Sequence, residues 1–158
     1  MTLYLIRHAH AVGAGEDPLR PLSSRGRSQV AQLTRFLQAG RQLHPSVFWH
    51  SPLARSRETA VLLAKGLGFA GPLVEIAGLE PEDEPRATAS LLASAPDGLA
   101  IVGHEPHLSA LATLLLRAGG GVPVVSLKKG SFLALEQDGG AWQIRWLIEP
   151  ELLGTASG

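Results

Sequence analysis

The chain has 158 residues, which fits one domain of ordinary size with a substantial hydrophobic core. Its 14 Lys and Arg residues balance 14 Asp and Glu residues, so no overall charge attracts nucleic acid or a membrane surface. The absence of cysteine excludes disulfides and thiolate chemistry, and only four scattered aspartates argue against metal-carboxylate or aspartyl-phosphate sites.

Short apolar runs alternate with helical patterns along most of the chain. The predicted strands cover residues 2–6, 47–49, 73–76, 99–102, 124–127, 131–136 and 142–148. The predicted helices begin near Ser23 or Ser24 and near Pro52, and two more cover 87–95 and 106–117. This order predicts a three-layer α/β/α sandwich with a mostly parallel central sheet and antiparallel strands at one edge.

The domain is expected to span residues 1–152, followed by a flexible C-terminal tail at 153–158. The first residues are apolar but lack the basic segment and the length of a signal peptide, and no apolar run approaches the roughly 20 residues that cross a bilayer. We therefore expect a cytoplasmic protein that binds neither membranes nor nucleic acid.

Three of the predicted parallel strands end in cationic or imidazole side chains. Arg7 and His8 follow the first strand, Arg55 lies just after the second, and His104 follows the fourth. Ligands of open α/β sheets bind beyond the carboxyl ends of strands, so we expect these side chains to share one site. Arginine binds phosphate oxygens, a neutral imidazole attacks phosphorus, and a second, protonated imidazole stabilises the transition state. The pattern predicts metal-free phosphoryl transfer.

Each of these residues alone has a more ordinary explanation. A single histidine at a strand end is more often a hydrogen-bonded structural residue, and a single arginine in a helix turn is usually solvated or paired. The coincidence of several at one sheet edge favours a site. Structural roles are expected for the remaining four histidines, His10, His44, His50 and His107.

Three sequence blocks then match a known pattern. They are Leu-Tyr-Leu-Ile-Arg-His-Ala at 3–9, Ser-Pro-Leu-Ala-Arg-Ser-Arg-Glu-Thr-Ala at 51–60 and Val-Gly-His-Glu-Pro at 102–106. In this order they resemble the signature blocks of the histidine phosphatase superfamily, whose fold is phosphoglycerate-mutase-like. The short chain and Arg-Pro-Leu-Ser at 20–23 resemble the small SixA-type phosphohistidine phosphatases. Ala9 stands where the first signature has glycine.

The resemblance implies a role for each matched residue. His8 would be the nucleophile that becomes a phosphohistidine intermediate, and Arg7 and Arg55 would clamp the phosphate. His104 would contact the phosphate and stabilise the transition state, and Arg20 would be a further phosphate or substrate contact. The resemblance implies no metal and no cofactor.

The general acid is left open. Many superfamily members carry an acidic residue after the third strand that protonates an alkoxide leaving group, whereas SixA-type members lack a clear donor. In the acidic loop 78–85, Glu80 is the first candidate, Glu82, Asp83 and Glu84 are competitors, and a solvated charge run is an equal alternative.

The substrate prediction follows from the leaving group and the length. Alkoxides profit from an acid by about 10²–10⁴-fold, whereas the P–N bond of phosphohistidine is labile without one. A short chain also leaves the pocket uncovered, so that a phosphorylated side chain of another protein can enter. We therefore expect a phosphatase of protein phosphohistidine. The alternatives are a small-molecule phosphomonoesterase of the same superfamily and a non-catalytic phosphate-binding module.

Other enzyme classes fit less well. His8-x-His10 resembles the start of an amidohydrolase barrel, but such a barrel needs about 250 residues. His104-Glu-Pro-His107 lacks the spacing of a zinc-binding H-E-x-x-H helix, and no glycine-rich nucleotide-binding motif occurs.

Overall fold

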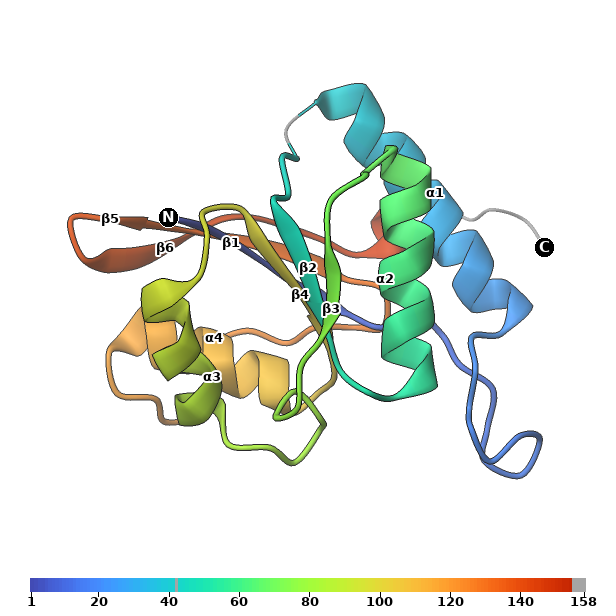
Figure 1. Ribbon diagram of the computed structural model, residues 1–158, viewed down its shortest axis with the longest axis horizontal. Coiled ribbons are helices and arrows are strands. Elements are labelled where there is room, and N and C mark those ends of the chain that lie inside the picture. Colours follow the sequence, from blue (N-terminus) through green and yellow to red (C-terminus); the bar gives the residue numbers. More distant parts are fainter. Residues whose placement is uncertain (42, 155–158) are drawn as a thin grey trace.

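A six-stranded sheet forms the centre of the computed structural model, which describes residues 1–41 and 43–154 (Figure 1). The strands lie in the order β3-β2-β4-β1-β5-β6; the first four are parallel, and β5 runs antiparallel to both of its neighbours. The strands are β1 (Thr2–Arg7), β2 (Val47–His50), β3 (Leu73–Glu75), β4 (Leu99–Gly103), β5 (Phe132–Asp138) and β6 (Ala141–Ile148). The helices are α1 (Ser24–Gly40), α2 (Ala54–Leu67), α3 (Pro85–Leu91) and α4 (His107–Arg117), with 3₁₀ turns η1 (Leu92–Ser94) and η2 (Pro150–Leu153).

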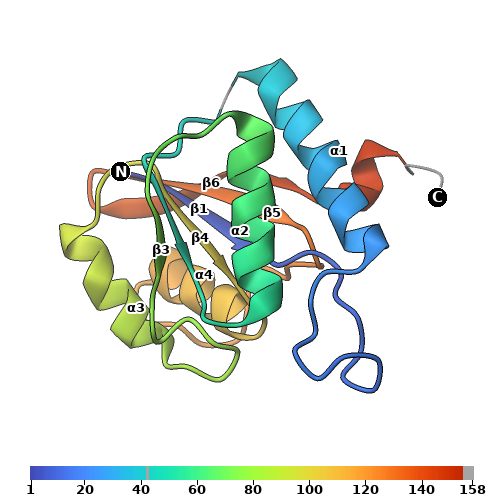
Figure 2. The same ribbon diagram turned by 45° about the vertical axis from the view of Figure 1, so that its right-hand side comes forward.

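Helices cover both faces of the sheet. Figures 1 and 2 show α1 beside α2 on one face and α3 beside α4 on the other. Because side chains alternate along a strand, β1 sends Tyr4 and Ile6 toward α1 and α2, and Leu3 and Leu5 toward α3 and α4. The central strands are buried on both faces and therefore read as continuous apolar runs.

The predicted fold class is confirmed, including the antiparallel edge. Ser23 is the residue that caps α1, since its hydroxyl accepts a bond from the Gly26 N–H at 3.1 Å. Helix α2 starts two residues after Pro52, with Leu53 as its N-cap. The segment 87–95 forms the end of α3 and the turn η1 rather than one helix.

The predicted strand at 124–127 is wrong. This segment belongs to the loop between α4 and β5, and side chains rather than a neighbouring strand bind its backbone. The Val124 N–H donates to the Thr113 hydroxyl at 3.0 Å, and the Leu127 N–H donates to the Glu105 carboxylate at 3.3 Å. These contacts replace the strand ladder that the β-branched residues favour.

The C-terminal part of the chain turns back onto α1. Leu153 ends η2 and packs against the core beside α1, and its carbonyl accepts a bond from the Gln32 side chain at 2.9 Å. The rest of the predicted tail, 155–158, lies outside the described residues. In the described ranges, no helix is long and apolar enough to span a membrane.

Candidate active site

The carboxyl ends of β1, β2 and β4 lie side by side because these strands are neighbours in the sheet. Arg7 pairs with Gly103 at the last position of the β1–β4 ladder, so the residues after each strand meet. The rings of His8 and His104 are 5.0 Å apart between centroids. Arg55 enters from the first turn of α2, and its charge acts on both histidines. Arg7, His8, Arg55 and His104, which come from three separate segments of the sequence, thus lie at one place.

His8 is buried and held in one orientation. Its Nδ1 atom lies 2.7 Å from the carbonyl oxygen of Ala9. A carbonyl only accepts, so Nδ1 carries the proton and Nε2 carries the free lone pair. Burial lowers the pKa of His8 to about 3; the bond to Ala9 opposes this shift, and the positive charges of Arg55 and Arg7 add to it. His8 is therefore neutral at physiological pH.

His104 is also buried, and one of its nitrogens has a partner. Nε2 lies 2.6 Å from the hydroxyl of Ser51, while Nδ1 has no hydrogen-bond partner among the described residues. Burial, followed by the proximity of His8 and Arg55, lowers the pKa of His104 to about 3. His104 is therefore neutral in this structure, with its ring held by Ser51, and its protonation during phosphoryl transfer stays a prediction.

Arg7 and Arg55 have no carboxylate within ion-pair distance in the described part of the chain. The Nη1 group of Arg7 donates to the Leu127 carbonyl at 2.8 Å, but the Nε atoms of both arginines are buried without a partner. Burial lowers the pKa of both guanidinium groups, which nevertheless stay protonated.

These unpartnered atoms concentrate at one place. Arg7 Nε, Arg55 Nε and His104 Nδ1 make up three of the five buried side-chain N or O atoms that lack a partner in residues 1–41 and 43–154; the others are His107 Nδ1 and Ser131 Oγ. Buried polar groups are nearly always hydrogen-bonded, so a cluster of unsatisfied donors indicates a ligand with several acceptor oxygens. An anion such as phosphate fits this requirement.

Arg20 reaches the same region from the loop after β1. Its backbone is left-handed, with φ +48°, and its Nε group donates to the Val12 carbonyl at 3.1 Å. The charge of Arg20 lowers the pKa of Arg55 and of Lys129, which shows that the three cations lie near one another.

The carboxylates of the acidic loop 78–85 differ in their hydrogen-bond partners. Asp83 accepts a bond from the Glu80 N–H at 2.7 Å, and Glu84 accepts one from the Arg86 N–H at 3.1 Å at the start of α3. The carboxylate of Glu80 is exposed, and its charge raises the pKa of Arg55. Of the first candidate Glu80 and its competitors, Glu80 is the one whose charge acts on Arg55, and its role as a general acid stays a prediction.

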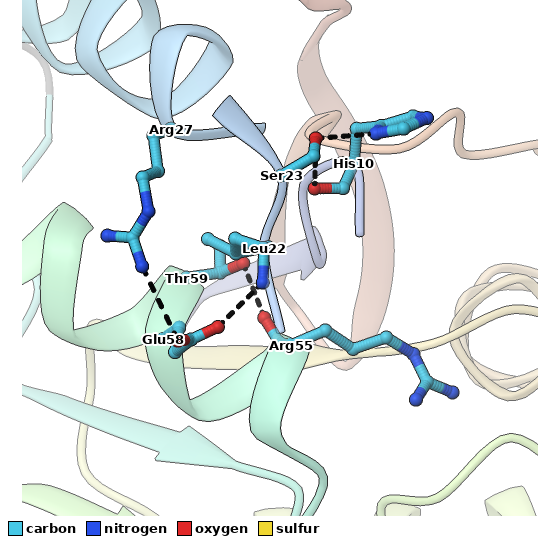
Figure 3. Close-up of polar contacts among 7 residues, drawn as sticks. All are labelled: His10, Leu22, Ser23, Arg27, Arg55, Glu58 and Thr59. Carbon is cyan, nitrogen blue, oxygen red and sulfur yellow. Dashed lines mark hydrogen bonds and ion pairs between the residues drawn. The ribbon is translucent and has the colours of Figure 1, made fainter. Parts of the chain in front are cut away.

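Hydrogen bonds from side chains of α2 connect this helix with the segment after β1, and Figure 3 shows the bond between Glu58 and Leu22. The hydroxyl of Thr59 accepts a bond from the Ala9 N–H at 3.1 Å and donates to the Arg55 carbonyl at 2.7 Å. Glu58 accepts a bond from the Leu22 N–H at 2.7 Å. Thr59 of the second block thus connects the backbone at Ala9, next to His8, with that of Arg55, and Glu58 holds the backbone at Leu22.

Two further residues near the site, Glu105 and Lys129, are not among the predicted site residues. Glu105 binds the backbone N–H of Ser109 at 2.9 Å and that of Leu127, and so holds the loop whose carbonyl receives Arg7. Lys129 lies in the same loop, and its charge lowers the pKa of His8. Glu105 lies within the third signature block, which could have indicated it, whereas Lys129 lies outside all three blocks and outside any periodic pattern.

The amino-acid sequence was compared with models of known protein families. The model described as histidine phosphatase superfamily (branch 1) matches residues 3–80, which contain two of the three sequence blocks. The chain belongs to the histidine phosphatase superfamily. As a member of this superfamily it is a phosphatase. A comparison with curated proteins finds no significant match.

Solved structures of several phosphatases share the fold. The protein histidine phosphatase SixA complexed with tungstate matches with a TM-score of 0.85 at 19% identity, over 97% of this chain and 99% of that one. The alpha-ribazole phosphatase from Shigella flexneri matches with a TM-score of 0.76 at 19% identity, over 95% and 97%. A mycobacterial glucosyl-3-phosphoglycerate phosphatase matches with a TM-score of 0.67 at 18% identity, over 92% and 97%.

Among the described residues, no group of three or more His, Asp or Glu side chains is arranged to hold a metal ion. His10, His50 and His107 each have a local partner: the Ser23 hydroxyl at 2.6 Å, the Ser51 carbonyl at 2.9 Å and the Thr88 hydroxyl at 3.0 Å.

Proposed function

We propose that this protein is a metal-independent phosphatase that works through a phosphohistidine intermediate on His8, and that its substrate is phosphohistidine in another protein. The observation that carries the proposal is the state of His8. Its Nδ1 proton is engaged by Ala9, burial keeps the ring neutral, and unpartnered donors of Arg7, Arg55 and His104 surround it. A neutral, oriented imidazole among free cationic donors is what attack on a phosphoryl group requires.

In the first step, the Nε2 lone pair of His8 attacks phosphorus in line with the bond that breaks. For phosphohistidine, the electron pair of the P–N bond returns to the substrate imidazole, which takes up a proton from water. In the second step, a water molecule attacks phospho-His8, the His8–phosphorus bond breaks, and inorganic phosphate leaves. His8 returns to its neutral form, and its Nδ1 stays bonded to Ala9.

The remaining site residues bind the negatively charged oxygens of the phosphoryl group during its transfer. Arg7 and Arg55 supply N–H groups to the phosphoryl oxygens and hold them in place before and during transfer. His104 donates its Nδ1 proton to a phosphoryl oxygen, and in the neutral ring Nε2 accepts a bond from the Ser51 hydroxyl. The dianionic substrate raises the pKa of His104, so the ring takes up a proton from solvent at Nε2, which then donates to the Ser51 oxygen. Arg20 is a further contact for the phosphate or the substrate.

Two observations support a protein substrate. The SixA structure, whose name describes a protein histidine phosphatase, matches almost end to end, so this chain adds no large segment to that fold. Two of the carboxylates in this part of the molecule are also engaged elsewhere: Glu105 is bonded to backbone groups, and Glu84 caps a helix. A site with little acid catalysis favours the labile P–N bond.

Glu80 favours the alternative of a small phosphomonoester. It is exposed, and its charge reaches Arg55, so a protonated Glu80 would serve an alkoxide leaving group. Related folds include phosphatases named for small-molecule substrates, such as the alpha-ribazole phosphatase.

A competition between substrates separates the candidates. A phosphohistidine-bearing protein and a panel of alkyl phosphomonoesters are compared by kcat/KM for the wild type and for Glu80→Gln. We expect the phosphohistidine protein to be preferred, with little change in Glu80→Gln. A preference for an alkyl phosphomonoester that falls by about 10²-fold or more in Glu80→Gln would support the alternative instead. Phosphate binding without turnover of any substrate would identify a binding module.

A further inference from the structure

A cavity of about 350 Å³ lies beside the proposed phosphate site and shares Arg7 with it. Its lining includes Arg7, His10, Arg25, Lys128, Lys129 and Glu151. These residues come from the end of β1, the first turn of α1, the loop before β5 and the turn η2. Since Arg7 belongs both to this cavity and to the proposed phosphate clamp, one substrate molecule can occupy both places.

The positive charges in the cavity are only partly neutralised. Lys128 has two acidic neighbours, Glu151 at 3.3 Å and Glu149 at 3.9 Å. Arg25 and Lys129 have no carboxylate within ion-pair distance among the described residues. Burial lowers the pKa of Lys129, and the nearby arginines Arg7, Arg20, Arg25 and Arg55 lower it further. Arg25 and Lys129 are therefore cations that lie near other cations and have no carboxylate partner among the described residues.

The wall formed by α1 is fixed by close backbone contacts. A Cβ atom at Gly26 would lie 2.0 Å from the carbonyl oxygen of His10, so only glycine allows this approach. The His10 N–H donates to the Gln29 side chain at 2.9 Å. These contacts hold the first turn of α1, which carries Arg25, against the segment that follows His8.

The opposite wall is attached to the end of β1. The Gly130 N–H lies 3.0 Å from the carbonyl of His8 and 3.2 Å from that of Arg7. The Ser131 N–H donates to the Lys128 carbonyl at 2.9 Å and closes a turn around Lys129. Both walls are therefore positioned by the same backbone that positions the nucleophile.

We propose that Arg25 and Lys129 form a second anion-binding subsite, which takes the carboxylate of an acidic residue beside the phosphorylated histidine of the protein substrate. This inference rests on the proposed function and names what the enzyme recognises in its substrate. Glu151 in the same cavity favours a ligand of small negative charge, such as one carboxylate, over a second phosphate. The exposed position of Arg25 suits contact with the surface of another protein.

Binding of stable peptides tests the subsite. The probes carry a phosphoryl-triazole analogue of phosphohistidine, with one Asp placed at successive flanking positions, and each has a counterpart with Asn. We expect the best Asp peptide to bind wild type about fivefold more tightly than its Asn counterpart. This difference should shrink at high ionic strength. Arg25→Gln and Lys129→Gln should abolish it, and Arg25→Lys should retain it.

Arg35→Gln is the matched control, because Arg35 is exposed on the same helix and lies outside the cavity lining. This variant should keep the full preference for Asp. Equal binding of all Asp and Asn peptides to wild type, or a preference that persists in Arg25→Gln and Lys129→Gln, would overturn the proposal. Turnover of the corresponding phosphohistidine peptides tests the catalytic proposal separately: an intact Asp preference without turnover would remove the activity and keep the subsite.

Discussion

Both ends of the sheet carry charged side chains, but those at one end have partners and several of those at the other end do not. At the amino end of the parallel strands, a cavity of about 380 Å³ is lined by Asp97, Glu136 and Arg145, among others. There Arg145 pairs with Glu136 at 3.1 Å, and Asp97 accepts a bond from the Thr2 N–H at 2.5 Å. At the carboxyl end, Arg7 and Arg55 have no carboxylate within ion-pair distance among the described residues. Cavity size therefore does not distinguish the two ends, whereas the pairing of charges does.

This difference indicates where the fold gives up local stability for ligand binding. A charged group without a partner in a desolvated place costs free energy that a paired group recovers in part. Natural proteins retain such groups mainly at functional sites. At the amino end, Arg145 and Asp97 have partners, as is usual for groups with a structural role. At the carboxyl end, Arg7, Arg55 and His104 each have a buried nitrogen without a partner.

The largest difference between the two ends should appear in arginine substitutions. Arg7→Ala and Arg55→Ala should each lower kcat/KM by about 10²–10³-fold, because each removes positive donors from the transferring phosphoryl group. Arg145→Ala at the amino end should stay within about twofold of wild type, since it loses only an exposed ion pair. Steady-state kinetics on phosphohistidine peptides measure all three. If Arg145→Ala lowered kcat/KM as much as Arg7→Ala and Arg55→Ala do, the proposed functional difference between the two ends of the sheet would be wrong.

Acid should destabilise the carboxyl end through its histidines. The pKa of His8 and of His104 is about 3 in the folded protein and about 6.5 when unfolded. Between these values the unfolded chain binds protons that the folded chain does not, so stability falls as the pH drops from about 6.5 to about 3. At pH 4.5, His8→Gln and His104→Gln should each reduce this loss by about 2 kcal/mol.

Denaturant titrations at pH 7 and pH 4.5 measure the effect. His44→Gln is the control, because His44 is an exposed histidine at the amino end. This variant should lose as much stability on acidification as wild type. If all three variants respond to pH alike, His8 and His104 do not have the low pKa values on which a neutral nucleophile depends.

The smallest expected effect on kcat concerns two buried histidines, each of which is hydrogen-bonded to a hydroxyl group. Ser51→Ala removes the partner of His104 and should lower kcat about tenfold, the equivalent of a hydrogen bond of about 1–1.5 kcal/mol. Thr88→Val removes the partner of His107, which faces α3 rather than the arginines, and should leave kcat unchanged. A loss of activity in Thr88→Val that matches the loss in Ser51→Ala would show that the effect is structural.

The sequence predicted the parts of the fold whose signal is local. The apolar run of β1 ends in Arg7 and His8, and the position of parallel strand ends then brings His104 to the same edge. The loop from 118 to 131 could not be predicted in this way, because its partners are Thr113 and Glu105 rather than a strand. Its β-branched residues gave a strand prediction that these side-chain contacts override.

The electrostatic state of the site was also beyond a sequence argument. That His104 is neutral depends on its burial and on the distances to His8 and Arg55, which no spacing in the chain encodes. Lys129 enters the site because Gly130 bonds to the backbone after β1. Long-range contacts of this kind position the side chains that surround the nucleophile.

Trapping of the covalent intermediate tests the central claim most directly. Wild-type protein is mixed briefly with a ³²P-labelled phosphohistidine protein, quenched, and digested to locate the label. The label should be on His8, unstable in acid and stable in base, and absent from His8→Ala. A wild-type protein that turns over substrate without labelling His8, or a His8→Ala variant with undiminished turnover, would contradict the mechanism.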